Sequence, residues 1–380
     1  MNKRVLRCWS AGVLGCVCLV LAGGVAAQAP WKEATAGYTY AFPRDHASHP
    51  DYKIEWWYYT GNVKAADGRR FGYQVTFFRV GIAPAPANPS KWAIRDLYMT
   101  HLAISDPSGR RYRYAEKLSR GGPGLAGAAT DQYRVWNDDW TATLDGSRES
   151  GVGSRHLLKA TDPKVGIDLI LDEGKAPAIH GIGGISQKGA QAGNASHYYS
   201  LTRMPTRGSI TVDGERFEVT GDSWMDHEFG TSFLEPGQRG WDWLSIQLSD
   251  GRELMLYQLR RDDGSRDPRS SGTLVAADGK TTHLDVKSFS LTPGRTTFKS
   301  KNGAVYPIEW AISIPSEKLE LKVTTPLNDQ ELALERSTGV AYWEGAIDVT
   351  GSASGKPVTG AGYLEMTGYF GSLGRVLSGK

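Results

Sequence analysis

Cysteine is almost absent from this 380-residue chain, and its three cysteines, Cys8, Cys16 and Cys18, all lie within the first 27 residues. Residues 28–380 therefore cannot form a disulfide bond with one another. Their folded state must depend instead on buried apolar area. A chain of this length is long enough to build two domains, each with its own core.

The chain also lacks an excess of either charge outside its N-terminal segment. It has 44 Lys and Arg against 41 Asp and Glu, and three of the basic residues fall within the first 27 positions. The rest of the chain is therefore balanced in charge. Nucleic-acid binding depends on a basic surface, so we expect no nucleic acid among its partners.

A hydrophobic run long enough to cross a membrane is missing as well, and residues 1–27 fit a secretory signal peptide. They begin with three basic residues, Lys3, Arg4 and Arg7. An apolar stretch over residues 13–22 follows, and small residues occupy positions 25–27. The stretch is shorter than the about 20 residues of a spanning helix. We predict cleavage near Ala27 and a periplasmic or secreted protein, and Cys16 leaves lipidation open as an alternative.

The sequence also lacks helical periodicity. No segment combines a sustained 3.6-residue apolar period with helix caps. Short β-branched and aromatic runs recur instead, separated by Asp-Gly and similar turn signals. Examples are residues 71–80, 97–105, 209–219, 243–248 and 361–369. This pattern predicts an all-β fold built from sandwiches or barrels.

The strand pattern is interrupted at Pro236-Gly237, which predicts two domains, residues 28–234 and 235–380. Two weak similarities cross this boundary and leave a duplication open. Trp56–Gly61 is similar to Tyr342–Gly345, and Gly68–Phe78 is similar to Gly251–Leu259.

Residues 181–193 are rich in glycine and contain a lysine, which suits a flap over a barrel mouth or a plain surface loop.

One candidate pocket wall is the strand around residues 55–59. Glu55, Trp57 and Tyr59 share one face of an extended strand, and His46 precedes it in a segment kept extended or turned by prolines. A carboxylate aligned with two aromatic rings suits a ligand pocket. It suits a structural hydrogen-bond network equally well.

The strand over residues 223–230 carries the main catalytic candidates. Trp224, Asp226 and Glu228 face one way, and His227 faces the other with Met225 and Phe229. Two close carboxylates raise one pKa and yield a proton donor near neutral pH. Alternatively, His227 points inward as the acid or base, or the carboxylates face solvent and pair with arginine.

Two further clusters complete the candidate site. Trp241 and Trp243 alternate onto one face of a strand, and Tyr257 offers a hydroxyl on the next one. His197 and Tyr199 lie beside the glycine-rich segment, where they could line the mouth of a pocket. These aromatic and imidazole groups are candidates for ligand contact.

Metal, serine-hydrolase and phosphate-loop motifs are absent. Asp45, His46, His49 and the run Asp226-His227-Glu228 contain metal-binding residue types, but their spacing matches no HExxH or cysteine-based pattern. No G-x-S-x-G elbow is present. We therefore predict no metal and no cofactor.

Four motifs in order, FPRDHASHPDYKIEWWYYTGNV, ASHYYSLTR, GDSWMDHEFG and GWDWLSIQLSDGRELMLYQLR, give the chain a family resemblance. Together they resemble the AttH-like family, the lipocalin-like group that contains bacterial carotenoid 1,2-hydratases (hydroxyneurosporene synthases). The resemblance runs from about Tyr38 to Tyr369. It implies two consecutive lipocalin-like antiparallel β-barrel domains with an apolar ligand cavity, and ABC-transporter components as partners.

The resemblance also implies a position for the hydratase acid, which protonates a carbon–carbon double bond before water traps the cation. That acid is expected two residues after a tyrosine. Here Tyr257 is followed at that distance by Leu259, which cannot donate a proton. Asp226, His227 or Glu228 would have to replace it.

The function predicted from the sequence is an exported lipocalin-like protein that binds a hydrophobic small molecule or lipid, with an ABC transporter as partner. The alternative is a cofactor-independent hydratase or isomerase with Asp226, His227 and Glu228 as acid and base groups beside Tyr257. A third is a purely structural subunit with filled barrels and no cavity. The predicted ligand contacts are His46, Glu55, Trp57, Tyr59, His197, Tyr199, Trp224, Trp241 and Trp243.

Overall fold

The computed structural model describes residues 31–371, apart from residues 85, 87, 146–153, 232, 233 and 338. The predicted signal peptide, residues 1–27, and its cleavage position lie outside the described residues. The described part is all-β, as predicted, with two short 3-10 helices, η1 (Arg44–His46) and η2 (Pro315–Glu317). None of its helices is long and apolar enough to cross a membrane.

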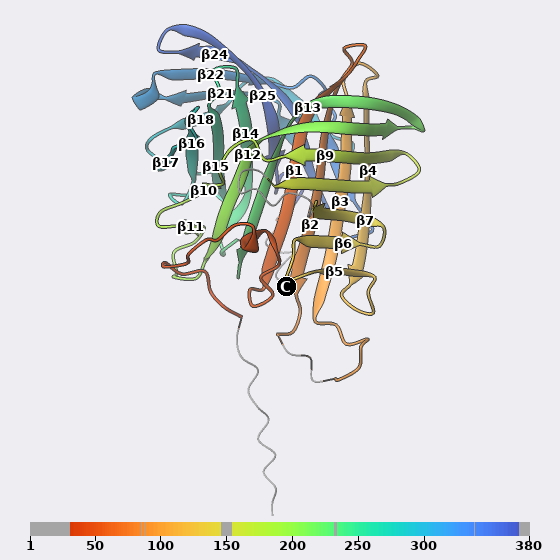
Figure 1. The fold of residues 1–380 in the computed structure, drawn as a ribbon. Helices are drawn as coiled ribbons and strands as arrows, with labels where there is room; N and C mark the ends of the chain where they lie inside the picture. The colour runs from red at the N-terminus through yellow and green to blue at the C-terminus, as the bar shows by residue number, and fades with distance from the viewer. Residues whose placement is uncertain are drawn as a thin grey trace, which may run out of the picture.

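A large antiparallel sheet contains the first thirteen strands, in the order β4-β3-β2-β1-β13-β12-β9-β8-β7-β6-β5, with β10 and β11 also paired to β12. In Figure 1, β5, β6, β7 and β9 cross over β1, β2 and β3, so this one sheet folds back on itself and is nearly closed. Its strands are β1 (Ile54–Ala65), β2 (Arg70–Gly81), β3 (Asp96–Asp106), β4 (Arg111–Arg120), β5 (Ala126–Ala128), β6 (Arg134–Asn137), β7 (Trp140–Leu144), β8 (Arg155–Thr161), β9 (Val165–Asp172), β10 (Ala178–Ile179), β11 (Ser186–Gln187), β12 (Ala195–Val212) and β13 (Glu215–Gly230).

A second antiparallel sheet follows, in the order β17-β16-β15-β14-β25-β24-β22-β21-β18, with β23 paired to β24. The chain passes from the first sheet to the second between Gly230 and Gln238, and the predicted boundary at residue 234 falls within this connection. The strands are β14 (Gln238–Leu248), β15 (Glu253–Arg261), β16 (Ser271–Val275), β17 (Thr281–Leu284), β18 (Ser290–Pro293), β21 (Glu309–Ile314), β22 (Leu319–Thr324), β23 (Glu331–Leu334), β24 (Val340–Ala353) and β25 (Lys356–Met366). A small separate ribbon pairs β19 (Thr297–Lys299) with β20 (Val305–Pro307).

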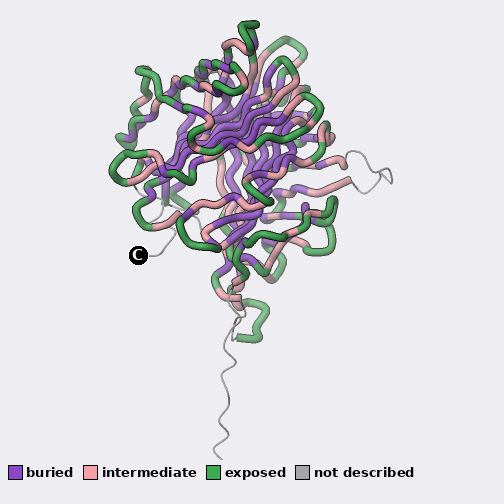
Figure 2. Tube along the Cα trace, turned by 90° about the vertical axis from the view of Figure 1, so that its left-hand side faces the viewer, coloured by how far each residue is buried: buried purple, intermediate pink, exposed green. Residues whose placement is uncertain are grey.

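Strand burial follows from the residue pattern. In β22, Leu319, Leu321 and Val323 are buried and alternate with exposed polar residues, which is the pattern of a sheet with one face in solvent. β1 and the end of β13 are instead buried on both faces. These strands therefore lie between two packed layers, and Figure 2 shows such buried segments running through the centre of the molecule.

Three apolar clusters explain this double burial. One fills the interior of the first sheet, and a second fills the interior of the second sheet. The third lies between the sheets, where Tyr58 and Trp224 of the first sheet pack with Trp243 and Tyr257 of the second. A hydrogen bond of 3.1 Å from Asn62 Nδ2 to the Gly362 carbonyl also joins β1 to β25. The two sheets thus share an extended interface.

The two sheets have a related strand order. In each, the first long strand pairs with the last, β1 with β13 and β14 with β25, and the next strands outward are β2 and β15. The similarity of Gly68–Phe78 to Gly251–Leu259 therefore joins equivalent strands. The similarity of Trp56–Gly61 to Tyr342–Gly345 does not, because it compares β1 with β24, whose position in the second sheet corresponds to that of β12.

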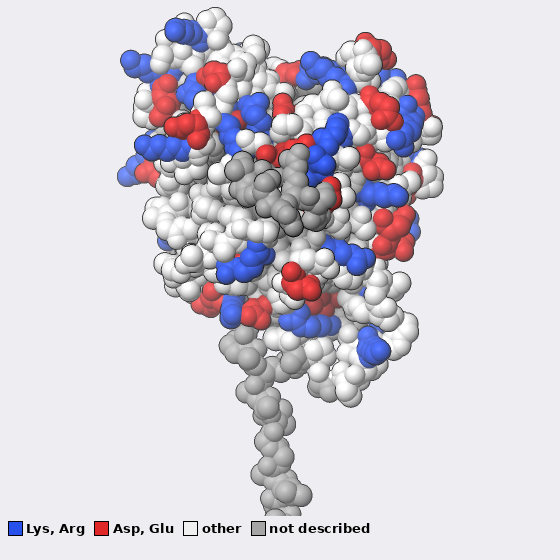
Figure 3. Space-filling view, in the orientation of Figure 1, with Lys and Arg blue, Asp and Glu red and all other residues white. Residues whose placement is uncertain are grey.

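The surface carries both signs of charge. On the face shown in Figure 3, Lys and Arg are interspersed with Asp and Glu, and uncharged residues lie between them. Several of these charges form ion pairs, among them Arg70 with Asp348 at 2.6 Å, across the interface between the two sheets. This view of the molecule therefore has no extended basic patch.

Candidate functional site

A cavity of about 100 Å³ lies between the two sheets. One wall comes from β1, β2, β12 and β13, and the opposite wall from β14, β15, β24 and β25. Most of the lining is aromatic: Trp56, Tyr58, Phe78, Tyr198, Trp241, Trp243 and Tyr257. The cavity is thus outside both sheet interiors, which are filled by side chains.

Strand register explains why these side chains meet. Trp56 is directly opposite Glu228, and Tyr58 is directly opposite Asp226, across the pairing of β1 with β13. Opposed residues in an antiparallel pair point to the same side of the sheet. Tyr198 of β12 is opposite Glu228 on the other edge of β13. The first wall therefore presents aromatic rings and two carboxyls together.

Asp226 is a buried carboxyl of this wall with three hydrogen-bond donors. Its Oδ1 accepts hydrogen bonds from Tyr198 Oη at 3.0 Å, from Trp224 Nε1 at 2.9 Å and from the Ser200 hydroxyl. Its buried Oδ2 has no hydrogen-bond partner among the described residues. Burial raises the pKa of Asp226 to about 7, because it outweighs these three hydrogen bonds and acts with the nearby charge of Glu228.

Glu228 is paired with Lys188. Lys188 Nζ lies 3.1 Å from its Oε1, and the Ser196 hydroxyl donates to the same oxygen. The ammonium group also lies over the Tyr257 ring, 4.3 Å from the centroid. Burial opposes the charge of Lys188, but Glu228 outweighs it and raises the pKa of Lys188. Lys188 therefore places a positive charge against the cavity.

The opposite wall adds two more carboxyls. Glu344 and Glu365 face each other directly across the pairing of β24 with β25, and Trp243 is opposite Glu365 on β14. Trp241 Nε1 donates to Glu365 Oε2 at 2.8 Å. Burial raises the pKa of Glu365 to about 7, and the charges of Asp226 and Glu228 add to this effect. Burial and the charge of Glu365 raise the pKa of Glu344 well above its usual range.

The other face of β1 and β13 carries a separate, fully buried polar network. His227 Nε2 lies 3.0 Å from Glu55 Oε1, and His227 Nδ1 lies 3.0 Å from Tyr199 Oη. Trp57 Nε1 donates to the His46 carbonyl at 3.0 Å. Burial lowers the pKa of His227 to about 4 despite the opposing effect of Glu55. This network belongs to the interior of the first sheet.

The structure therefore divides the residues predicted from the sequence into two groups. The cavity contains Asp226, Glu228, Tyr257, Trp241 and Trp243, and Trp224 reaches it as a donor to Asp226. The structure places the others on the interior side of the first sheet: His227, His46, Glu55, Trp57, Tyr59, His197 and Tyr199. The proposal that His227 joins Asp226 and Glu228 in one acid–base group does not fit this placement, because adjacent strand residues point to opposite faces.

Three titratable residues of the cavity, Lys188, Glu344 and Glu365, were not among the candidates predicted from the sequence. Lys188 comes from the glycine-rich segment 181–193, whose single lysine was the available signal. Glu344 lies in the motif Tyr342–Gly345, which suggested a duplication and not a site. Glu365 carries no recognisable signal in the sequence. Leu259, at the position expected for the hydratase acid, does line the cavity.

Comparisons with known proteins agree with this architecture. A family model described as AttH-like matches residues 33–369. A crystal structure of a protein assigned as AttH, from Nitrosomonas europaea, is 33% identical, covers 89% of this chain and 99% of its own, and superposes with a TM-score of 0.79. The crystal structure of kievitone hydratase from Nectria haematococca is 17% identical, covers 90% of this chain and 99% of its own, and shares the fold with a TM-score of 0.66.

A curated protein also matches at the level of sequence. It is the dehydratase asqC of Emericella nidulans, which is 21% identical over 293 residues. The match covers 72% of this chain and 77% of that protein. It therefore includes most of both chains.

Proposed function

The chain belongs to the AttH-like family, and from this premise we propose that it is a cofactor-independent hydro-lyase acting on an apolar, unsaturated substrate. The observation that carries the proposal is Asp226. One of its oxygens is fixed by three hydrogen bonds and the other has no partner among the described residues, in a cavity with aromatic walls. A carboxyl group with a pKa near the working pH is well suited to general acid catalysis.

The proposed reaction needs one proton donor and one proton acceptor. In the hydration direction, Asp226 transfers its proton to one carbon of a double bond, and a water oxygen bonds to the other carbon. The surplus proton of that water passes to Glu365, whose pKa is also about 7. Dehydration runs through the same steps in reverse, with Asp226 and Glu365 exchanging protons with solvent between turnovers.

The aromatic walls would stabilise the positive charge that develops on carbon. Trp243 and Tyr58 face the cavity with their rings 5.2 Å apart and nearly perpendicular. Aromatic faces attract cations by roughly 0.5–2 kcal/mol each. The ion pair of Glu228 with Lys188 beside the same space has no net charge, so this stabilisation comes from the aromatic faces. An apolar substrate fits these walls better than a charged one.

Two similar proteins support water addition or elimination as the reaction type. One is named a dehydratase and the other a hydratase, which are the two directions of the same chemistry. The predicted pairing of His227 with Asp226 is not needed for it. Leu259 lines the cavity but cannot donate a proton, so the acid in this chain must be another residue, and we assign that role to Asp226 of β13.

The second candidate function is binding without chemistry, as an exported carrier of a hydrophobic molecule or lipid. The aromatic lining favours it, and the predicted signal peptide would place such a carrier in the periplasm or outside the cell. An ABC transporter as partner belongs to this candidate. The two functions differ in what happens to a bound molecule.

The test is incubation of the purified protein with a panel of polyenes, enones and their hydrated counterparts in water labelled with heavy oxygen. A hydro-lyase incorporates the label into product, or releases water from the hydrated compound, and mass spectrometry detects both. Binding of several panel members with no conversion of any would exclude the hydro-lyase for these classes and leave the carrier. Heat-denatured protein gives the background rate of hydration.

A further inference from the structure

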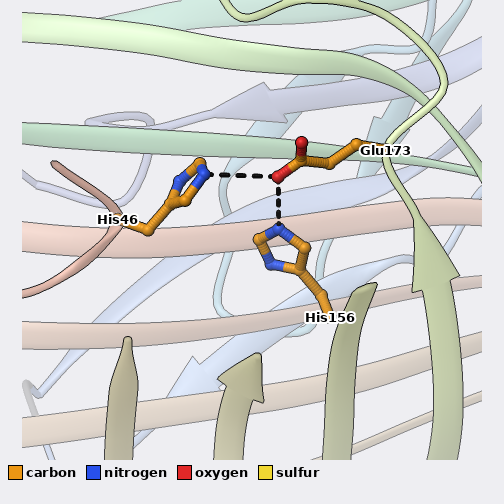
Figure 4. Close-up of side chains that lie close together, drawn as sticks. All are labelled: His46, His156 and Glu173. Carbon is orange, nitrogen blue, oxygen red and sulfur yellow. Dashed lines mark hydrogen bonds and ion pairs between the residues drawn. The ribbon is translucent and has the colours of Figure 1, made fainter. Parts of the chain in front are cut away.

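Inside the first sheet, three side chains from separate elements converge on one point (Figure 4). His46 ends η1, His156 lies in β8, and Glu173 directly follows β9. The Nε2 atom of His46 lies 3.2 Å from Glu173 Oε1, and the Nε2 atom of His156 lies 3.1 Å from the same oxygen. One ligand atom of each residue lies within 4.8 Å of those of the other two.

These residue types and distances suit a divalent transition metal. Two imidazoles and one carboxylate are a recurrent three-residue ligand set for zinc, which leaves a fourth position for water. With bonds of about 2.0–2.1 Å, neighbouring ligand atoms of a tetrahedral site lie about 3.3 Å apart. The two observed nitrogen–oxygen distances, 3.1 and 3.2 Å, are close to that spacing.

The second ring nitrogen of each imidazole is also hydrogen-bonded, as it generally is in metal-binding histidines. His46 Nδ1 lies 2.7 Å from Tyr199 Oη, and His156 Nδ1 lies 2.9 Å from Tyr59 Oη. Where each tyrosine oxygen accepts the Nδ1 hydrogen, Nε2 is left with a lone pair directed at Glu173. A cation bound between the three groups would be coordinated by both lone pairs and by the carboxylate.

A neighbouring cluster of the same composition shows why this one is the better cation site. His49, Glu55 and His227 also converge. There, however, the buried guanidinium of Arg79 lies 3.1 Å from Glu55 Oε2 and already balances its charge. Among the described residues, the ion pairs found for Glu173 are with His46 and His156 alone. Within the described part of the chain, the carboxylate of Glu173 therefore lacks a permanent positive partner.

We propose that His46 Nε2, His156 Nε2 and the Glu173 carboxylate form a binding site for a divalent transition metal of the zinc class. The Glu173 side chain is 12% exposed, while both imidazoles are almost fully buried, so the ion enters from the side of the carboxylate. The site would fasten η1 to the strands β8 and β9. It lies on the opposite side of the sheet from the cavity, so it is independent of the proposed hydro-lyase activity.

The experiment is calorimetric titration of zinc chloride into the purified protein after treatment with a chelator. We expect one equivalent of zinc to bind and to raise the melting temperature. Glu173→Gln keeps the size of the side chain and should weaken binding at least 100-fold, and His156→Asn should do the same. The matched control is His49→Gln, in the neighbouring cluster, which should still bind one equivalent.

Two results would overturn the proposal. One is the absence of stoichiometric binding by the wild-type protein to zinc, cobalt or nickel ions, in which case the three residues form only a hydrogen-bond network. The other is binding that Glu173→Gln leaves unchanged. If His156→Asn fails to fold, Glu173→Gln with a native circular dichroism spectrum decides the matter alone. Cobalt substitution adds a visible absorption spectrum that reports the coordination geometry directly.

Discussion

Asp226 and His227 are neighbours in the chain, but their side chains lie on opposite faces of β13 and in different chemical environments. Asp226 lines the cavity between the sheets, and His227 is bonded to Glu55 inside the first sheet. Burial raises the pKa of Asp226 to about 7 and lowers that of His227 to about 4. Near neutral pH, Asp226 is therefore partly protonated, whereas His227 is neutral and hydrogen-bonded to Glu55.

The first prediction is that Asp226→Asn lowers kcat for hydration or dehydration by about 10²–10⁴-fold. The amide keeps the size of the side chain and its hydrogen bond to Trp224 can be retained, but it cannot transfer a proton. Steady-state kinetics with a substrate from the panel measure the effect. KM should change little, because the aromatic walls are unchanged.

The control for this variant is Glu218→Gln on the same strand. The Glu218 side chain is 74% exposed and pairs only with Arg216 among the ion pairs of the described residues. It should leave both kcat and KM as in the wild type. A wild-type kcat in Asp226→Asn would remove Asp226 from the mechanism.

The second prediction concerns pH. If Asp226 donates and Glu365 accepts, the reactive form has one protonated and one ionised carboxyl, and kcat should follow a bell with its maximum near pH 7, where both groups titrate. Glu365→Gln should abolish the fall on the acidic side, since that limb reports protonation of the acceptor. A rate that rises steadily from acidic to alkaline pH would contradict this assignment.

The raised pKa of Asp226 also predicts how the free energy of unfolding changes with pH. Asp226 binds its proton more tightly in the folded protein than in the unfolded chain, where the ordinary pKa of 3.8 applies. Its stabilising contribution is present below that value and is lost as pH rises through about 7. Urea unfolding should therefore show a smaller decrease of stability over this interval in Asp226→Asn than in the wild type.

The division of strand faces could be predicted from the sequence, but the location of the cavity could not. Alternation in residues 223–230 correctly separates Asp226 and Glu228 from His227. Which face borders a cavity depends on the packing of the second sheet, and β13 is buried on both sides there. Glu365 enters the site only through its pairing in β25, far along the chain.

The same limit applies to the histidines. His46 and His156 are more than a hundred residues apart and meet only because the first sheet folds back on itself. Spacing within one motif therefore gave no sign of the cluster with Glu173. Aromatic strand residues predicted a pocket wall for Trp57 and Tyr59, but the hydrogen-bond network that was left open as the alternative is what their face of β1 contains.

The third prediction is that Trp243→Ala weakens binding of an apolar fluorescent probe by about 10–100-fold. Trp243 contributes a large part of the aromatic wall and packs edge-on against Tyr58. Loss of a large apolar contact costs about 1.5–3 kcal/mol, and 1.4 kcal/mol corresponds to tenfold in affinity. Fluorescence titration measures the dissociation constant of the probe.

The matched control is Trp92→Ala, because Trp92 is 57% exposed and lies away from the cavity lining. It should bind the probe as the wild type does. Equal weakening in both variants would mean that the probe binds exposed aromatic surface and does not report the cavity.

The fourth prediction is that loss of the ion pair between Lys188 and Glu228 destabilises the fold. It tests whether the glycine-rich segment 181–193, which carries Lys188, is packed against the cavity. Lys188→Met leaves a buried carboxylate without its partner, and such a loss costs about 3 kcal/mol of unfolding free energy. The double variant with Glu228→Gln should recover most of this, because no uncompensated charge remains. Urea unfolding of the two single variants and the double variant gives the coupling energy.

The loss of unfolding free energy in an exposed ion pair provides the control. It shows how much of the effect of Lys188→Met comes from the burial of the pair. Lys322 and Glu309 lie 2.9 Å apart with side chains 58% and 30% exposed. Lys322→Met should cost less than about 1 kcal/mol, because water already solvates both groups. A loss of the same small size in Lys188→Met would mean that solvent reaches Glu228 freely. The segment 181–193 would then be an open loop, and the positive charge assigned to the cavity would be screened.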